Sequence, residues 1–393
     1  MLSVAQARAH ILALAPLPLR EIVPLASAAG RVLFEPLTAS RSQPPFAASS
    51  MDGYAAKRAD LHDGAVLTIV GESAAGGGWD GQLQSGQALR IFTGAPVPNG
   101  ADTVIIQEDV TSDGTYITLG QNRDTAQYIR PAGDDFLVGQ MFGAGRRLNA
   151  QHIALLAAMN HAYIPVARRP IVALVPTGNE LVNVGEIASA SQIISSNNLG
   201  LKALIEQAGA LVRLLPIAPD TATGLSATLA QCAEADLIVT LGGASVGDHD
   251  LVATVGQKAG LKLDFYKIAM RPGKPLMAGR LNGIPMVGLP GNPVSSMVCG
   301  YVFLLPLLRA ILGLPQAAPL QRLPLAAALP PNGKRTHYMR ARIADGLVHI
   351  HQRQDSSLLS VLAESDCLAI QPNDDPGMPK GALIEIMPLS TIS

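Results

Sequence analysis

The sequence is poor in cysteine and in aromatic residues, and it has no excess of charge of either sign. Its 393 residues include three cysteines and one tryptophan, and the formal net charge is −1. Cys232, Cys299 and Cys367 are far apart in the sequence and form no C-x-x-C pair, so we expect neither a disulfide framework nor a zinc site. We therefore expect a cytoplasmic location. Because no general positive charge attracts nucleic acid or an anionic membrane, any anion site must be built locally.

The chain also shows no clear membrane segment. The first eight residues lack the charged and then apolar layout of a secretory signal and predict the start of an amphipathic helix. Residues 289–308 are uncharged and numerous enough to span a membrane, but Pro290, Asn292, Pro293 and Pro306 interrupt them. A buried helix is therefore favoured, and we expect no membrane and no nucleic-acid partner.

What the chain does have is apolar residues in several distinct patterns. They make up 48% of it, which suggests about two to four globular domains. Residues 1–15 predict a helix, and 51–139 alternate short β-branched runs with turns, which indicates a small inserted β domain. A helix over 149–158, with Asn149 as its N-cap, is expected to return and pack against the N-terminal helix.

From residue 170 onward, apolar strands, glycine turns and helices alternate, which is typical of an α/β fold. Short alternating runs after residue 315 predict a C-terminal β-barrel or sandwich. The predicted architecture is multidomain α/β plus β: a discontinuous N-terminal helical-linker domain (1–40 and 140–168), an inserted β domain (41–139), an α/β domain (169–316) and a C-terminal β domain (317–393).

The α/β domain is organised around residues 236–250, where a buried strand, 237–241, runs into a glycine-rich turn. Ligands of parallel sheets bind beyond the carboxyl ends of the strands. Glycines let backbone N–H groups approach a phosphate, and carboxylates suit a hard cation such as Mg²⁺. A tight turn with solvated acids is the alternative. The candidates here are Gly242, Gly243, Ser245, Gly247, Asp248 and Asp250.

Other strand ends carry further candidates. Thr177, Gly178 and Glu180 follow the strand 171–175, and Asp220 follows the strand 212–217. Ser196 and Asn197 lead into a helix, where they could hold a phosphate or act only as an N-cap.

Two proline-containing turns complete the set of candidates. Lys267, Arg271 and Lys274 lie around the rigid turn that contains Pro272 and Gly273. They form a local anion site or, alternatively, a solvated loop. The turn Pro290, Gly291, Asn292 and Pro293 opens the long apolar helix, so its N–H groups are also free for an anion.

At these motifs the sequence resembles the molybdopterin molybdenumtransferase family, which includes the MoeA proteins and the E domain of gephyrin. The matching stretches occur in family order: 50–55, 93–98, 177–181, 196–197, 242–248, 272–275 and 289–295. The resemblance implies a discontinuous domain, an inserted β domain, a three-layer molybdopterin-binding α/β domain and a C-terminal β-barrel. The segmentation from the residues themselves agrees with this.

The resemblance also implies an activity and its partners. A homodimer with sites shared between subunits would insert molybdenum from molybdate into adenylylated molybdopterin, with Mg²⁺-dependent hydrolysis and release of AMP. A molybdopterin adenylyltransferase would supply the substrate, and molybdoenzyme apoproteins or their chaperones would receive the product.

The resemblance assigns roles to particular residues. Glu180 and Asp250 would bind Mg²⁺, and Lys267, Arg271 and Lys274 would hold molybdate. Arg340 and Ser356 of the last domain would close that site, while Asp52, Thr93 and Asp135 of the inserted region would reach the site of the other subunit.

The chain departs from the family pattern at three positions. Asn179 replaces a common aspartate, Ala244 a common valine, and Arg271 a common lysine, which changes a point charge to a planar fork. Two alternative functions remain at this stage: a non-catalytic dimeric scaffold of the same fold, and a pterin adenylyltransferase or pyrophosphate hydrolase. The inserted and C-terminal domains disfavour the second alternative. Glu180, Asp250 and Lys274 disfavour the first.

Overall fold

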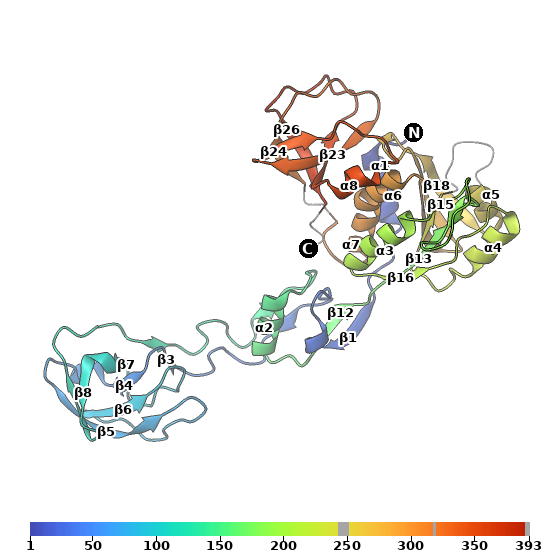
Figure 1. Cartoon of the computed structure of the whole chain (residues 1–393). Helices are drawn as coiled ribbons and strands as arrows, with labels where there is room; N and C mark the ends of the chain where they lie inside the picture. Colours follow the sequence, from blue (N-terminus) through green and yellow to red (C-terminus); the bar gives the residue numbers. More distant parts are fainter. Residues whose placement is uncertain (243–250, 317–319, 390–393) are drawn as a thin grey trace.

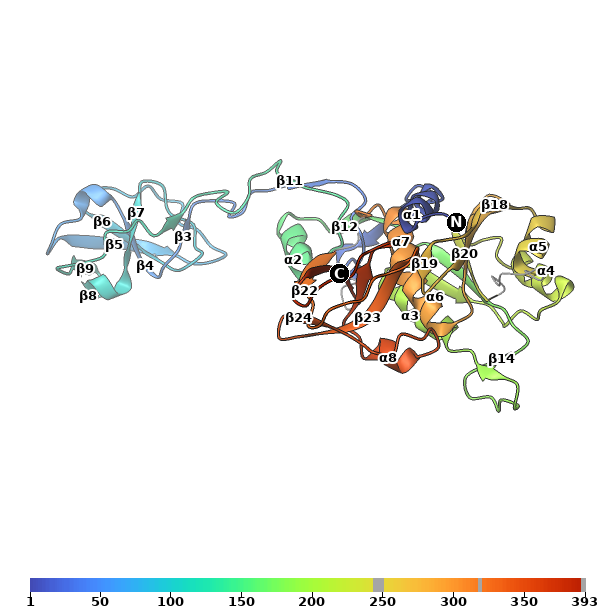
Figure 2. The same cartoon turned by 90° about the horizontal axis from the view of Figure 1, so that it is seen from above.

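The computed structural model describes residues 1–242, 251–316 and 320–389. The molecule is elongated (Figures 1 and 2), with the inserted β domain at one end and the α/β and C-terminal domains at the other. A narrow region of paired chain segments joins the two ends.

A six-stranded sheet forms the centre of the α/β domain. Its order is β16-β13-β17-β21-β20-β18, in which the first four strands are parallel and the last two form an antiparallel extension. Every residue of β17 is buried, as expected for a central strand covered on both faces. The strands are β13 (Ile171–Pro176), β16 (Leu211–Leu214), β17 (Leu237–Leu241), β18 (Leu261–Lys267), β20 (Pro275–Leu281) and β21 (Ile284–Leu289).

Helices cover both faces of this sheet, which gives the predicted three layers. One core contains residues of α1, α3, α6 and α7, and a second core lies under α4 and α5. The helices are α1 (Val4–Ala13), α3 (Asn197–Gln207), α4 (Ala222–Ala230), α5 (Leu251–Lys258), α6 (Pro293–Cys299), a π-helical turn η4 (Gly300–Leu304) and α7 (Leu305–Ile311). The run Pro293–Ile311 could span a membrane by length and composition, but 72% of its most apolar window is buried. The prediction of a buried core helix is confirmed.

Helix α1 belongs to the core of the α/β domain. Ser3 and Gln6 form a capping box at its start, and Val4, Ala7 and Ile11 are buried together with α7. Helix α2 (Ala150–Ala158) instead packs on η1 (Leu25–Ser27) in a separate core. The prediction that these two helices pack together is therefore wrong, because the chain between them leads away from the α/β domain before α2 forms.

The discontinuous region is held by short antiparallel ladders. Strand β1 (Arg20–Pro24) pairs with β12 (Tyr163–Ala167), and β2 (Leu37–Thr38) pairs with β11 (Met141–Phe142). Asn149 accepts a hydrogen bond from His152 N at the start of α2, which confirms the predicted N-cap.

The inserted domain is a β structure, as predicted. Its main sheet has the order β7-β4-β6-β5-β9-β8. Its elements are β3 (Ala48–Ser49), β4 (Gly53–Ala56), η2 (Arg58–Asp60), β5 (Val66–Ser73), β6 (Gln87–Ile91), β7 (Thr103–Ile106), η3 (Gln107–Asp109), β8 (Val110–Ser112), β9 (Tyr116–Leu119) and β10 (Ile129–Arg130).

The C-terminal domain is joined to the α/β domain by a strand that the sequence did not predict. Strand β19, which follows β18, pairs in parallel with β23 of the C-terminal sheet. Leu325 immediately follows β22 and forms a β-bridge with Val348 of β24. This bridge connects β22 and β24, which lie at the two ends of that sheet. The elements are β19 (Met270–Arg271), β22 (Gln321–Pro324), β23 (Thr336–Ala344), β24 (Leu347–Ile350), α8 (Leu359–Ala363), β25 (Cys367–Gln371) and β26 (Leu383–Pro388).

Candidate functional site

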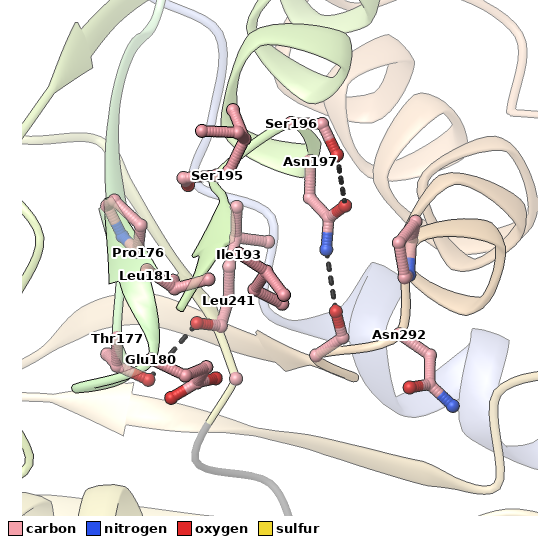
Figure 3. Close-up of a pocket in the computed structure, with 14 residues that line it drawn as sticks. Pro176, Thr177, Glu180, Leu181, Ile193, Ser195, Ser196, Asn197, Leu241 and Asn292 are labelled. Atoms are coloured by element: carbon pink, nitrogen blue, oxygen red, sulfur yellow. Dashed lines mark hydrogen bonds between the residues drawn. The ribbon is translucent and has the colours of Figure 1, made fainter. Parts of the chain in front are cut away.

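A pocket lies beyond the carboxyl ends of β13 and β17, at the place predicted for a ligand (Figure 3). The described residues enclose about 200 Å³, less than the ~300–1,000 Å³ of pockets that surround a whole drug-sized ligand. The part of the pocket that they form is therefore too small to surround a whole drug-sized ligand. Its lining consists of Pro176, Thr177, Glu180, Leu181, Ile193, Ile194, Ser195, Ser196, Asn197, Leu241, Gly242, Gly291, Asn292 and Pro293.

The ends of β13 and β17 meet closely at the base of this pocket. Thr177 donates to Leu241 O from both its backbone N (2.9 Å) and its Oγ1 (3.1 Å). Gly242 has φ +88°, and a Cβ there would lie 2.7 Å from Thr177 O. Only glycine allows this approach, because a side chain would both clash and strain the backbone.

Glu180 offers a free carboxylate at the mouth of the pocket. Gly178 has φ +143°, and a Cβ there would lie 2.5 Å from Glu180 Oε2, so the carboxylate group lies directly over the glycine. Among the described residues no donor forms a hydrogen bond to this exposed group. The short pair β14 (Leu181–Val182) and β15 (Ile193–Ile194) then leads from Glu180 to helix α3.

Ser196 and Asn197 connect the start of α3 to the proline-containing turn. Ser196 occupies the N-cap position but its side chain makes no capping bond. Asn197 Nδ2 donates to Gly291 O (2.6 Å) and to Ser296 Oγ (3.3 Å), and the first of these bonds is drawn in Figure 3. The alternative of simple side-chain capping by Ser196 or Asn197 is therefore wrong. Leu199 N donates to Asn198 Oδ1 (2.8 Å), which leaves the first-turn N–H groups of Asn197 and Asn198 without an acceptor among the described residues.

The turn Pro290–Pro293 also contacts the C-terminal domain. Asn292 Nδ2 donates to Ser356 Oγ (3.0 Å), and Val294 N donates to Ser356 O (3.0 Å). Because Val294 is in the first turn of α6, this bond uses one of the helix's free N–H groups. The structure thus brings Ser356 to the edge of the pocket.

Arg340 lies in β23, near Ser356, and is fully buried. Its Nε donates to Gln354 Oε1 (3.0 Å) and its Nη1 to Asp355 O (2.8 Å). Its Nη2 has no hydrogen-bond partner among the described residues. Burial lowers the pKa of Arg340, the nearby Asp355 carboxylate opposes this effect, and Arg271 lowers the pKa further.

The three predicted cations lie around the hairpin between β18 and β20. Lys267 ends β18, Arg271 ends β19, and Lys274 immediately precedes β20. None of them forms an ion pair with a carboxylate of the described chain. Pro272 and Gly273 between them are buried, and a Cβ on Gly273 would lie 2.6 Å from Cys299 Sγ, so the turn is seated tightly on α6.

His337 adds a buried imidazole beside these cations. Residue 337 is paired with Arg271 in the ladder between β19 and β23, and its Nε2 has no hydrogen-bond partner. Burial lowers the pKa of His337 to about 4, helped by Arg271, Arg340 and Arg335.

Asp220 is close to Asn179 and does not line the pocket. Asp220 N donates to Asn179 Oδ1 (3.0 Å), and Asn179 N donates to Asp220 Oδ2 (3.3 Å). An amide at position 179 therefore places no second negative charge beside the Asp220 carboxylate.

Asp52 precedes β4 and Thr93 follows β6 in the inserted domain, which lies at the opposite end of the molecule from the α/β domain (Figure 1). Asp52 Oδ1 accepts from Thr93 N (2.7 Å) and from Thr93 Oγ1 (2.8 Å). These bonds, and to a smaller extent Arg90, lower the pKa of the exposed Asp52 carboxyl. Asp135 lies in the connecting segment, where its backbone N donates to Gln43 O (2.9 Å).

Five predicted residues lie outside the described ones: Gly243, Ser245, Gly247, Asp248 and Asp250. Within residues 1–242, 251–316 and 320–389 no three His, Cys, Asp or Glu side chains are grouped as a metal site.

Two further residues of the site were missed from the sequence. Ser296 Oγ donates to Pro290 O (2.8 Å) and Asn292 O (2.9 Å), and Gln354 orients Arg340. The signal for Ser296 was its position one turn into the helix after the proline-containing turn. Nothing in the sequence singled out Gln354.

Comparison with known families covers nearly the whole chain. Residues 2–160 match the MoeA N-terminal region (domains I and II), residues 173–310 match a probable molybdopterin binding domain, and residues 322–389 match the MoeA C-terminal region (domain IV).

Individual relatives agree with these matches. A molybdopterin molybdenumtransferase of Nostoc sp. is 35% identical over 90% of this chain and 85% of its own length, and one of Haemophilus influenzae is 33% identical over 99% of both. The crystal structure of a molybdopterin biosynthesis MoeA protein from Pyrococcus horikosii superimposes with a TM-score of 0.87 at 26% identity and covers all of both chains.

Proposed function

The chain belongs to the MoeA family, it is a molybdopterin molybdenumtransferase of molybdenum cofactor biosynthesis, and we propose that the pocket beyond β13 and β17 is where it carries out the transfer. The observation that supports this location is the convergence of two helix N-termini, α3 and α6, beside the free Glu180 carboxylate. The match to the MoeA N- and C-terminal regions disfavours a lone pterin adenylyltransferase or pyrophosphate hydrolase.

The substrate that we propose is adenylylated molybdopterin, whose pyrophosphate would lie between α3 and α6. Helix N-termini favour anions, because their N–H groups and their dipoles both point at the ligand. The first turn of α3, whose N-cap residue Ser196 forms no capping bond with its side chain among the described residues, offers the N–H groups of Asn197 and Asn198. Because Asn197 joins the two N-termini through Gly291 O, it keeps both ends directed at one ligand.

The residues present fit a Mg²⁺ ion of the kind that binds with phosphate. Mg²⁺ in such sites uses one or two carboxylates, waters and substrate phosphate oxygens rather than a complete protein cage. Glu180, whose carboxylate accepts no hydrogen bond from the described residues, would supply one carboxylate, and Asp250 would supply the second. The ion would neutralise phosphate charge and polarise the phosphorus. Hydrolysis of the phosphoanhydride would release AMP.

Molybdate, a tetrahedral dianion, would bind beside this pocket as the second substrate. Within the described residues, Lys267, Arg271 and Lys274 form no ion pair, and Arg340 Nη2 has no hydrogen-bond partner. Ser356, already bonded to Asn292, would close the site from the C-terminal domain. Charge-assisted bonds to an oxyanion suit this set of donors, and molybdenum would pass from here to the dithiolene sulfurs.

The active form that we propose is a homodimer with shared sites. Asp52 and Thr93 belong to the inserted domain, which lies at the opposite end of the molecule from the α/β domain. They would therefore act in the pocket of the partner subunit, and Asp135 would follow them there. A molybdopterin adenylyltransferase would deliver the substrate in the cytoplasm, and molybdoenzyme apoproteins or their chaperones would take the product.

A single-turnover assay with adenylylated molybdopterin tests the reaction. We expect AMP release that requires molybdate and is lost in Glu180→Gln. Glu206→Gln, which removes a charge from an exposed carboxylate on α3 that pairs with Lys202, is the matched control and should turn over normally. Hydrolysis indifferent to molybdate would indicate a pyrophosphatase, and binding without turnover would indicate a scaffold.

Mixing two strongly impaired variants tests the shared site. Asp52→Asn and Glu180→Gln chains, each with only residual turnover alone, should recover about a quarter of the wild-type activity after random exchange, because half of the dimers then contain one intact site of two. No recovery, with exchange verified by mass spectrometry, would place both residues in the site of one chain.

A further inference from the structure

Arg90 lies beside Asp52 in the inserted domain and is held between two aromatic rings. In the ladder between β4 and β6, Arg90 is paired with Tyr54, two residues after Asp52. Its Cζ lies 4.7 Å from the ring centre of Phe92 and 5.1 Å from that of Tyr54. Contacts with two rings restrict the orientation of the guanidinium plane.

The fork of Arg90 is linked to the backbone carbonyl groups on both sides of Gly53. Nη1 donates to Gly53 O (3.3 Å) and Nη2 to Gln107 Oε1 (2.9 Å). Gln107 N in turn donates to Asp52 O (3.1 Å). The carbonyl groups of Asp52 and Gly53 thus belong to one network centred on Arg90.

The turn also has no room to shift toward β7. A Cβ on Gly53 would lie 1.8 Å from Ile105 O, so β4 is pressed against its neighbour. With Oδ1 of Asp52 already accepting two bonds from Thr93, Oδ2 is the oxygen that no described donor occupies. The exposed carboxylate therefore presents one free oxygen in a direction set by its backbone.

We propose that Arg90 is a positioning residue for Asp52, because it fixes the direction in which Asp52 Oδ2 is presented to the pocket of the partner subunit. This inference rests on the proposed role of Asp52 in that pocket. A lysine keeps the charge but cannot reach Gly53 O and Gln107 together while lying flat between two rings. Direct contact between Arg90 and the substrate is the competing possibility.

A double-mutant comparison separates these possibilities. We expect Arg90→Lys to lower molybdate-dependent AMP release roughly 10- to 100-fold, the range produced by small misplacements of a reacting group. In the Asp52→Asn background, Arg90→Lys should lower the remaining AMP release by less than about twofold, because the effects of substituting residues that act as a unit are not additive. An equal loss in both backgrounds, or no loss in the wild-type background, would overturn the inference.

Arg123→Lys is the matched control. Arg123 lies in the same domain and also donates from both Nη groups to a side chain and a backbone carbonyl, but its acceptors are Asp63 Oδ1 (2.7 Å) and Leu61 O (2.8 Å). This variant should keep wild-type turnover. The fluorescence of Trp79, the single tryptophan, verifies in each variant that the inserted domain is folded.

A titration distinguishes failure of this inference from failure of the proposed function. If Asp52→Asn turns over like the wild type, the proposed role of Asp52 is wrong, and carboxyl NMR still decides the role of Arg90. The Asp52 resonance should titrate at higher pH in Arg90→Gln than in the wild type, because the neighbouring charge and the fixed geometry are both lost. It should not move in Arg123→Gln. An unchanged Asp52 titration in Arg90→Gln would refute the positioning role.

Discussion

Two glycines with the same backbone conformation allow a direct test of how tightly the pocket is built. Gly242 and Gly283 both have φ +88°. A Cβ on Gly242 would lie 2.7 Å from Thr177 O and 3.0 Å from Thr177 Oγ1, whereas a Cβ on Gly283 would meet nothing within 4 Å. Alanine at either position should cost about 1 kcal/mol for the left-handed backbone. Alanine at Gly242 should cost roughly 1–3 kcal/mol more, because Thr177 must move to admit the methyl group.

The assay is urea unfolding followed by far-UV circular dichroism, since the fluorescence of Trp79 reports the inserted domain and not the α/β domain. We expect the order of stability to be wild type, Gly283→Ala and then Gly242→Ala. Turnover should fall only in Gly242→Ala, because Thr177 and Gly242 line the pocket. Equal stability and equal turnover of the two variants would refute the tight contact between the ends of β13 and β17.

Three other substitutions test separate parts of the structure. Burial lowers the pKa of His337 from 6.5 to about 4, so the unfolded chain binds a proton at this residue more readily than the folded protein does. The free energy of unfolding should therefore fall by up to about 3 kcal/mol as the pH drops from 6.5 to 4. His337→Gln should remove this part of the loss, as measured by urea titrations across that pH range. Gly53→Ala should destabilise the inserted domain by about 3 kcal/mol or more, because the added methyl group overlaps Ile105 O. The unfolding transition followed by Trp79 fluorescence should then occur at a lower urea concentration, and an unchanged transition would contradict that contact. Asn197→Ala should cost only about 1 kcal/mol of stability but weaken the binding of adenylylated molybdopterin measured by calorimetry; unchanged affinity would separate Asn197 from the phosphate site.

Much of the local structure could be read from neighbouring residues. Asn149 was identified as an N-cap because its side chain needs only the backbone of the following turn, and the strand 237–241 was identified because its apolar residues form one continuous run. The prolines around Asn292 likewise indicated that the long apolar segment is not a membrane span. In each case the deciding interactions lie within a few positions of one another along the chain.

The errors and omissions concern contacts between distant segments. Helix α1 was expected against α2, and it packs with α7 because its buried residues complete the α/β core. Strand β19 was missed because two residues carry no periodic signal, and they form a strand only where β23 is available as a partner. Arg90 and Gln354 act through groups that are remote in sequence, so no local pattern could reveal them.

The sequence by itself determined the domain order, the family and the residue types of the site, because glycine turns, caps and apolar periods are local properties. Only the tertiary structure decided that Asn197 bonds Gly291, that Ser356 reaches Asn292, and that Asp52 lies far from the pocket of its own chain. These relations depend on how separately formed elements pack. Burial of apolar surface is non-directional, so the sequence sets which faces are buried, and complementary packing selects which of them meet.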